Sequence, residues 1–358
     1  MKKTYLSIQY IRAIACMMVV LFHFRGTMNN VYPVKDIGNM LFRWGEVGVD
    51  AFFIISGFII AYATMHKESL SVFYIKRFFR IYPAYLLAIV LLYPVFETSG
   101  FASYFIDSVL LKPIDESKGS PFWGYQNLTV AWSLLYEVVF YIIYGACMMA
   151  SHKHRNIICC SVIILICFSS QLAMTGSFMF GPGGGAEINS FPQLSAATSS
   201  MMLTFIIGII LFEICNFLVE KNIQISKGIM IKSIALSTCF FFACYFNGFF
   251  SWHGVNRSVI FIAPIIFSIV IYDCLYGIGK CRILSFLGDK SYSLYLFHTI
   301  VPTYMFIYLG SEYRDLKGIA KLAVILSASI CFSYIATRFV EIPSVRISRK
   351  LIGKFKGD

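Results

Sequence analysis

Apolar residues occur in long blocks along the chain, and short polar segments separate these blocks. An α-helix rises about 1.5 Å per residue, so one membrane crossing needs roughly 20 mainly apolar residues. Ten segments meet this requirement: 5–24, 47–65, 80–97, 130–150, 156–175, 197–218, 231–250, 257–276, 289–309 and 318–340. The pattern predicts an all-α fold, a polytopic membrane protein with about ten transmembrane helices.

Two further segments need a separate interpretation. The run FASYFIDSVLL (101–111) is too short to span a bilayer and carries Asp107, so we expect an interfacial or re-entrant piece. The N-terminus starts as a signal peptide does, with MKK before an apolar stretch. Arg12 interrupts that stretch, however, and no small-x-small cleavage site follows, so we expect an uncleaved first span.

Composition supports the membrane assignment. Hydrophobic residues make up 58% of the chain and charged residues 13%, whereas soluble domains carry about 25% charged residues. The net charge of +12 is expected to reflect basic loops that face anionic lipid rather than nucleic acid, which we do not expect as a partner. The eleven cysteines form no CxxC pair, so no metal site is predicted.

The placement of lysine and arginine predicts the orientation. If the N-terminus is cytoplasmic, the inner segments hold 20 Lys and Arg residues and the outer loops hold 8. Because basic residues accumulate on the cytoplasmic side, both termini are expected there, with an even number of spans. We divide the chain into a transmembrane domain, 1–345, and a basic cytoplasmic tail, 346–358.

Arg12 and His23 are both ionisable residues within the first predicted span. A charged side chain at mid-bilayer costs about 2.5–3.5 kcal/mol, so such residues commonly serve a function. Eleven residues are about three helical turns, which puts both side chains on one face, roughly 16 Å apart along the axis. Arg12 is then in the inner half, and His23 is near the outer end. For His23 alone, an ordinary interfacial histidine remains an alternative.

Two carboxylates are predicted at about the depth of His23. Asp50 lies in the run GVDAFFIISGF, where Ser56 and Gly57 permit close helix approach. Glu137 follows in the fourth span. A carboxylate next to a histidine raises its basicity and fixes its tautomer. For Asp50, an acid that only stabilises a helix N-terminus is an equally reasonable interpretation.

The run FYIKRFFRIYP presents Lys76, Arg77 and Arg80 at the inner entry of the third span. Arg77 and Arg80 are three residues apart and share a helix face. Because arginine pairs with phosphate in a bidentate manner, these residues predict a site for a phosphorylated cytoplasmic ligand. The alternative is that they only enforce topology. His298 is expected at mid-depth in the ninth span, where a structural role is an equal alternative.

Six stretches together resemble the acyltransferase 3 family of integral membrane acyltransferases. They occur in the family's order and cover the whole membrane core. The stretches are Arg12-x10-His23, GVDAFFIISGF with Asp50, Arg77-x2-Arg80 with IYP, WSLLYE with Trp132, Ser133 and Glu137, SYSLYLFH ending in His298, and FVEIP near the C-terminus.

The resemblance implies a ten-span enzyme of the bacterial inner membrane. Such enzymes take an acyl group, commonly acetyl from cytoplasmic acetyl-CoA, and transfer it to a hydroxyl of a carbohydrate at the outer side. Acceptors in the family include O-antigen, exopolysaccharide and capsule, polymeric or lipid-linked. By the same resemblance, Arg12 and His23 are the essential motif, and Arg77 and Arg80 are associated with the donor.

We therefore expect a donor path that leads from Arg77 and Arg80 past Arg12 to His23. His23 is the predicted general base on the sugar hydroxyl, oriented by Glu137 or Asp50. Arg12 or Trp132 is expected to stabilise the thioester oxyanion, and a covalent acyl-histidine stays open. The outer segment SPFWGYQN carries aromatic residues that can stack on the acceptor sugar.

Two other classes of function fit parts of the sequence. Buried ionisable groups in ten spans are also typical of a secondary transporter or flippase for a polysaccharide precursor. The sequence shows neither an inverted repeat nor a matching pair of broken helices, which disfavours that reading. A non-catalytic subunit of polysaccharide assembly is the second alternative, and it has no need for the arginine and histidine cluster.

Overall fold

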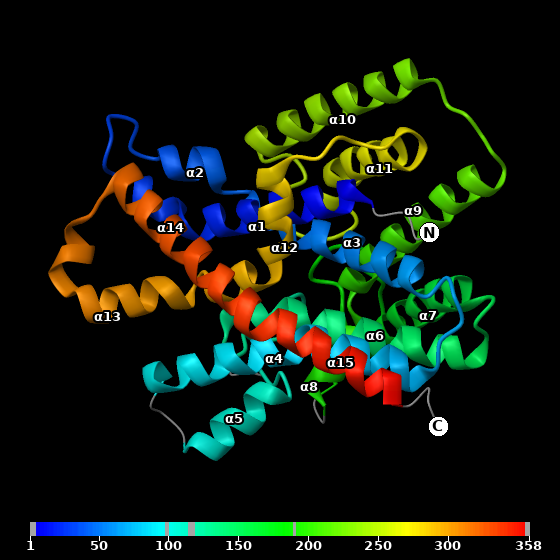
Figure 1. Ribbon diagram of the computed structural model, residues 1–358, viewed down its shortest axis with the longest axis horizontal. Coiled ribbons are helices and arrows are strands. Elements are labelled where there is room, and N and C mark those ends of the chain that lie inside the picture. Colours follow the sequence, from blue (N-terminus) through cyan, green and yellow to red (C-terminus); the bar gives the residue numbers. More distant parts are fainter. Residues whose placement is uncertain (1–4, 97–99, 114–118, 189–190, 355–358) are drawn as a thin grey trace.

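The computed structural model describes the chain except for residues 1–4, 97–99, 114–118, 189–190 and 355–358. The described residues form helices and connecting loops without any strand (Figure 1). Nine helical segments among them are long and apolar enough to cross a membrane. The predicted all-α, polytopic membrane fold is confirmed.

The structure describes twelve longer helices, most of which follow the predicted apolar segments. They are α1 (Leu6–Phe24), α3 (Gly48–Ala63), α4 (Leu70–Phe96), α6 (Trp132–Ala150), α7 (Arg155–Thr175), α9 (Leu203–Glu220), α10 (Lys227–Asn247), α11 (Ser258–Tyr276), α12 (Arg282–Phe297), α13 (Ile300–Asp315), α14 (Gly318–Ala336) and α15 (Ile342–Lys354). Three short helices lie between them: α2 (Ile37–Phe42), α5 (Phe101–Val109) and α8 (Pro192–Thr198). The predicted non-spanning segment 101–111 is thus a nine-residue helix.

The predicted single span 289–309 is wrong, because a turn at His298 and Thr299 separates α12 from α13. Helix α12 lies parallel to α1 over most of its length. Gln9 Nε2 donates a hydrogen bond to Asp289 Oδ1 at 2.5 Å, and the histidine pair at the other end brings His298 to α1. Helix α12 therefore runs alongside α1 through the bundle. Helix α13 turns away from α1 (Figure 1).

Burial inside the bundle explains why the sequence pattern misplaced this span. Ser291 and Ser293 of α12 are fully buried, and both side chains have hydrogen-bond partners. A helix enclosed by protein does not need the apolar surface that lipid demands, so the crossing starts earlier and is more polar than the hydropathy pattern indicated.

Helices α14 and α15 form one continuous rod, because the five residues Thr337–Glu341 are π-helical rather than a break. In Figure 1 this orange and red rod crosses the molecule diagonally. Ser344 Oγ donates a hydrogen bond to the Phe79 carbonyl of α4 at 2.9 Å. The boundary proposed between residues 345 and 346 falls inside α15, and residues 355–358 of the predicted tail lie outside the described residues.

The loops gather at two opposite ends of the bundle, as the predicted alternation requires. We call the end with residues 25–47, 110–113, 119–131, 176–188, 191–202 and 248–257 the outer end, following the charge bias. There Tyr245 OH donates to the Leu41 carbonyl at 3.1 Å, and Ser120 Oγ donates to the Pro182 carbonyl at 2.8 Å. At the inner end, Tyr10 OH donates to the Gly279 carbonyl at 2.9 Å.

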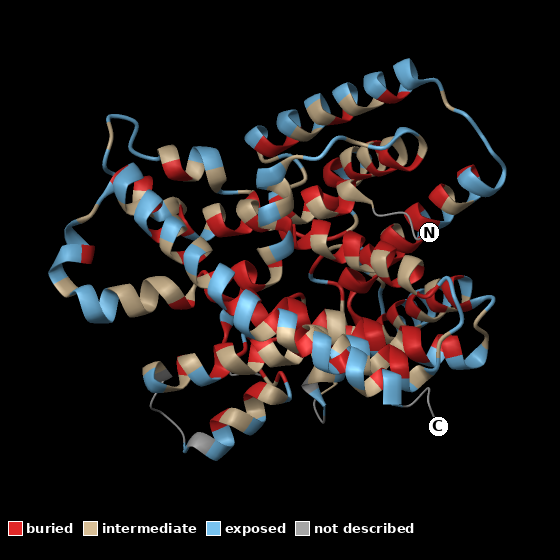
Figure 2. Ribbon diagram, in the orientation of Figure 1, coloured by how far each residue is buried: buried red, intermediate tan, exposed pale blue. Residues whose placement is uncertain are grey.

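The core of the bundle is formed by helices that contact each other closely. Buried residues concentrate in α3, α6 and α9, whereas α10 exposes most of its surface (Figure 2). Leu236 of α10 and Leu165 of α7 are 74% and 65% exposed. Large apolar side chains on an outer face suit contact with lipid tails.

Candidate active site

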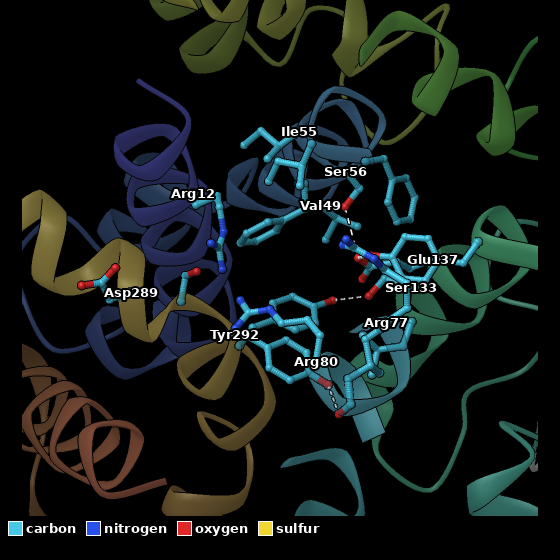
Figure 3. Close-up of a pocket in the computed structure, with 18 residues that line it drawn as sticks. Arg12, Val49, Ile55, Ser56, Arg77, Arg80, Ser133, Glu137, Asp289 and Tyr292 are labelled. Carbon is cyan, nitrogen blue, oxygen red and sulfur yellow. Dashed lines mark hydrogen bonds between the residues drawn. The ribbon is translucent and has the colours of Figure 1, made fainter. Parts of the chain in front are cut away.

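Five helices enclose a cavity of about 300 Å³ between the two ends of the bundle. Figure 3 shows Arg12 from α1, Arg77 and Arg80 from α4 and Glu137 from α6 around this space. Asp289 of α12 also lines it. We call this space the arginine cavity. Its volume is at the lower end of the range for ligand pockets.

The three arginines of the arginine cavity differ in their partners. Arg80 Nη1 donates to Glu341 Oε2 at 2.8 Å, so this cation is neutralised within the protein. Arg77 packs against the rings of Phe73 and Tyr141, with 5.7 Å from the guanidinium carbon to each centroid. Its Nε atom is buried without a hydrogen-bond partner.

Arg12 and Arg77 have no carboxylate partner among the described residues, whereas Arg80 has one. An unpaired cation inside a helical bundle is energetically unfavourable unless an anion joins it. Arg12 and Arg77 therefore keep hydrogen-bond donors for an anionic ligand, although the carboxylates of Glu137 and Asp289 line the same cavity.

Glu137 lines the arginine cavity, and its hydrogen bonds go to residues other than His23. Its Oε1 atom accepts hydrogen bonds from Ser56 Oγ at 3.2 Å and from the Tyr141 hydroxyl. Helix α6 begins at Trp132, which puts Glu137 more than one turn below the outer end. Glu137 and Arg12 therefore line the same cavity.

Lys76 does not line the arginine cavity. Its side chain is exposed and pairs with Glu68 in the loop before α4. The run of three basic residues thus divides into two that face the cavity and one that faces away, as the helical angle between neighbouring residues requires.

His23 lies in the last turn of α1 and pairs with His298, not with a carboxylate. Its Nδ1 atom is 2.9 Å from the Val19 carbonyl oxygen and 3.2 Å from His298 Nε2. A carbonyl only accepts, so this network assigns the hydrogen to Nδ1 of His23 and leaves its Nε2 atom unprotonated.

The side chain that contacts His23 is His298, whereas the sequence analysis predicted Asp50 or Glu137 in this role. The Nδ1 atom of His298 is 2.8 Å from the Tyr295 carbonyl oxygen, which leaves Nε2 as the acceptor for His23. His298 is fully buried, whereas the His23 side chain is exposed. The predicted mid-depth position of His298 is wrong because α12 ends at the preceding residue.

Tyr295 lies between the arginine cavity and the histidine pair. It lines the cavity, and its ring centroid is 6.1 Å from that of His298. The hydroxyls of Tyr295 and Ser133 are 2.7 Å apart. Tyr295 therefore connects the lining of the cavity to the histidine pair.

Asp50 binds His253, a residue that the sequence analysis missed. His253 Nδ1 is 2.7 Å from Asp50 Oδ2, and the Gly254 N–H donates to Asp50 Oδ1 at 2.9 Å. Burial lowers the pKa of His253, but the carboxylate of Asp50 outweighs this effect and the pKa is raised above its usual value. The only signal in the sequence was a histidine in a predicted outer loop.

Trp132 takes part in this second histidine site. Its ring centroid is 5.2 Å from that of His253, and the side chain is buried. Trp132 does not line the arginine cavity, whereas the neighbouring Ser133 does. The first turn of α6 thus lies between the two histidine sites.

The fold and the cavity define a helical membrane protein with a polar interior site, and comparison with known proteins gives its family. The profile of the family described as an acyltransferase domain matches residues 5–338. The chain therefore belongs to this acyltransferase family, and several of its helices are long and apolar enough to span a membrane. This membership favours an enzyme over the transporter, flippase and assembly-subunit alternatives.

Two relatives illustrate the range of the family. The chain is 24% identical to the peptidoglycan O-acetyltransferase OatA of Listeria monocytogenes, over 98% of this chain and 57% of that protein. It is 27% identical to an uncharacterized protein of Haemophilus influenzae, over 64% of this chain and 94% of the relative. The chain thus spans little more than half the length of the first relative. No solved structure matches the chain.

Proposed function

We propose that the protein transfers an acyl group, most simply acetyl, from acyl-CoA at the inner end to a hydroxyl of a carbohydrate at the outer end. The O-acetyltransferase relative supports this proposal, and both relatives are bacterial proteins. The bacterial plasma membrane is the corresponding location.

The observation that carries the proposal is that two arginines of the arginine cavity, Arg12 and Arg77, form no ion pair with a carboxylate among the described residues. Coenzyme A has a phosphate-rich head and a long, thin pantetheine arm. Arg77 and Arg80 at the inner entry suit the phosphates, since guanidinium groups bind phosphate oxygens in pairs. Arg12 lines the same cavity and binds the donor further along its path.

The transfer step takes place where the arm reaches the histidine pair. His23 Nε2 removes the proton from the sugar hydroxyl as its oxygen attacks the thioester carbonyl carbon. A C–O bond forms, the C–S bond breaks, and the CoA sulfur leaves as a thiolate that takes up a proton. His298 holds the imidazole of His23 in the reactive tautomer.

We propose separate roles for the remaining candidates, based on the depths of their side chains. Arg12 is about 16 Å from His23 along the helix axis, which is too far to contact an oxyanion formed at His23. We assign Arg12 and Glu137 to donor binding and orientation. The hydroxyls of Tyr295 and Ser133 lie closer to the histidine pair and are better placed to stabilise the oxyanion.

The proposal is tested with His23→Ala and Glu137→Gln, using acetyl-CoA and glycan from cells that lack the gene. Loss of a general base lowers the rate about 10²–10⁴-fold, so His23→Ala is expected to lose turnover while it still binds CoA. Glu137→Gln is expected to change the KM for acetyl-CoA more than the KM for glycan. His154→Ala, an exposed histidine at the inner end, is the matched control.

Two results would overturn the proposal. If the wild-type protein consumes no acetyl-CoA with any surface glycan, the assigned reaction is wrong. If His23→Ala retains near wild-type transfer at equal expression, the reaction stands but the assignment of His23 fails.

A further inference from the structure

Aromatic side chains from two outer loops form a cluster beside the Asp50–His253 pair. Phe122 stacks on Tyr125 with ring centroids 5.1 Å apart, and its centroid is 6.5 Å from that of Trp252. It is also 6.1 Å from the ring of His253. Tyr125 and Trp252 are 46% and 42% exposed, so the cluster is partly open to the outside.

The backbone holds Trp252 in a sparsely populated conformation. Its φ angle is +75°, in the left-handed region that a bulky side chain seldom adopts. Such conformations persist where the surrounding structure determines them, and they are frequent at ligand sites. Here the strained turn places Trp252 next to His253.

The Asp50–His253 pair leaves one ring nitrogen for a ligand. Nδ1 is bound to Asp50, and Nε2 has no hydrogen-bond partner within the described parts of the chain. Nε2 accepts a hydrogen bond when the imidazole is neutral and donates one when it is protonated. A hydroxyl group satisfies both states, because it is a donor and an acceptor.

The Asp50–His253 pair is close to the histidine pair of the proposed reaction. Trp132 contacts His253 on one side of α6, and the next residue, Ser133, binds Tyr295 on the other side. Glu46, one turn before Asp50, lies within electrostatic range of both His253 and Arg25. The two sites therefore border the same part of the outer end.

We propose that Asp50, His253, Phe122, Tyr125 and Trp252 form a carbohydrate subsite that binds the acceptor. This inference rests on the proposed function and adds the place where the sugar is held. The aromatic faces pack against the apolar C–H face of a sugar ring, and His253 Nε2 binds one of its hydroxyls. A site built to bind a hydroxyl discriminates strongly against a sugar that lacks it.

The test measures transfer from acetyl-CoA while the concentration of glycan, extracted from cells lacking the gene, is varied. His253→Gln and Trp252→Ala are each expected to raise the KM for glycan about tenfold, as expected for the loss of one favourable contact. The KM for acetyl-CoA and the affinity for CoA are expected to stay unchanged. Trp252 is partly exposed, so its variant tests the subsite even if His253→Gln folds poorly.

The control is Phe249→Ala, an aromatic residue of the same loop that is 64% exposed and contacts the ring of Phe250 alone among the described aromatic pairs. It is expected to keep the wild-type KM for glycan. The subsite is disproved if Trp252→Ala and a folded His253→Gln both leave the KM for glycan unchanged. If the wild-type protein itself transfers no acetyl group, the proposed function fails and not the subsite alone.

Discussion

Cations inside the bundle fall into two groups according to their partners. Arg155 donates hydrogen bonds to Thr64 Oγ1 at 2.9 Å and to the His152 carbonyl, and Arg80 pairs with Glu341. These two residues stabilise the fold through their partners, in addition to any ligand that they bind. Arg12 and Arg77 lack such partners among the described residues, and this difference marks them as binding residues.

This difference predicts opposite effects for two neighbouring arginines. Arg77→Gln removes a cation that no carboxylate neutralises, so it should leave the melting temperature unchanged or higher while CoA affinity falls at least tenfold. Arg80→Gln strands the buried Glu341 carboxylate and is expected to destabilise the fold by about 2 kcal/mol. Thermal unfolding and CoA titration in detergent measure both effects.

The double variant Arg80→Gln with Glu341→Gln is the control for the ion pair. It is expected to recover part of the lost stability, because no buried carboxylate remains unpaired. Equal destabilisation by Arg77→Gln and Arg80→Gln would contradict the distinction between the two arginines.

At the scale of helices, close contact between α3 and α9 sets the shape of the core. A Cβ atom built on Gly57 would lie 2.1 Å from the Phe205 carbonyl oxygen, and one on Gly208 would lie 1.8 Å from that of Ile54. The sequence predicted close approach at Gly57, and the structure identifies α9 as the partner. This contact holds Ser56 in place against Glu137.

Gly208→Ala is therefore expected to push α9 away from α3. The added methyl group meets backbone atoms that cannot move aside, so we expect a loss of about 1–3 kcal/mol, as for overpacking of a core. Thermal unfolding in detergent measures it. Gly353→Ala in α15, where no heavy atom lies within 4 Å of the added Cβ, is the control, and an equal loss there would refute the explanation.

At the scale of the whole molecule, the arginine cavity and the two histidine sites lie at different depths of one bundle. The proposed reaction needs its donor from one side of the membrane and its acceptor from the other. This arrangement depends on α12 as a tenth crossing, since nine other helical segments are long and apolar enough to span the bilayer.

A tenth crossing places the N- and C-termini on the same side. A fluorescent protein fused after residue 358 is expected to fluoresce in the cytoplasm, and one fused to the N-terminus should do the same. Alkaline phosphatase inserted in loop 248–257 should be active outside. Termini on opposite sides would show that α12 does not cross and would invalidate the predicted orientation.

The sequence predicted the helical bundle, most of its spans and the three arginines of the arginine cavity. Hydropathy and the cost of burying charge act locally along the chain, so these features can be read from it. The hydropathy pattern misplaced α12, because protein rather than lipid surrounds this helix. The sequence analysis also paired His23 with the wrong residues, because His298 is 275 positions away.

The sequence by itself therefore determined which side chains had to find partners inside the membrane, since each one is unfavourable in lipid. Only the tertiary structure decided which partners they found. Asp50 binds His253, Arg80 binds Glu341, and Arg12 and Arg77 stay open to a ligand. The physical reason is that pairing depends on helix packing, which brings together residues far apart in the chain.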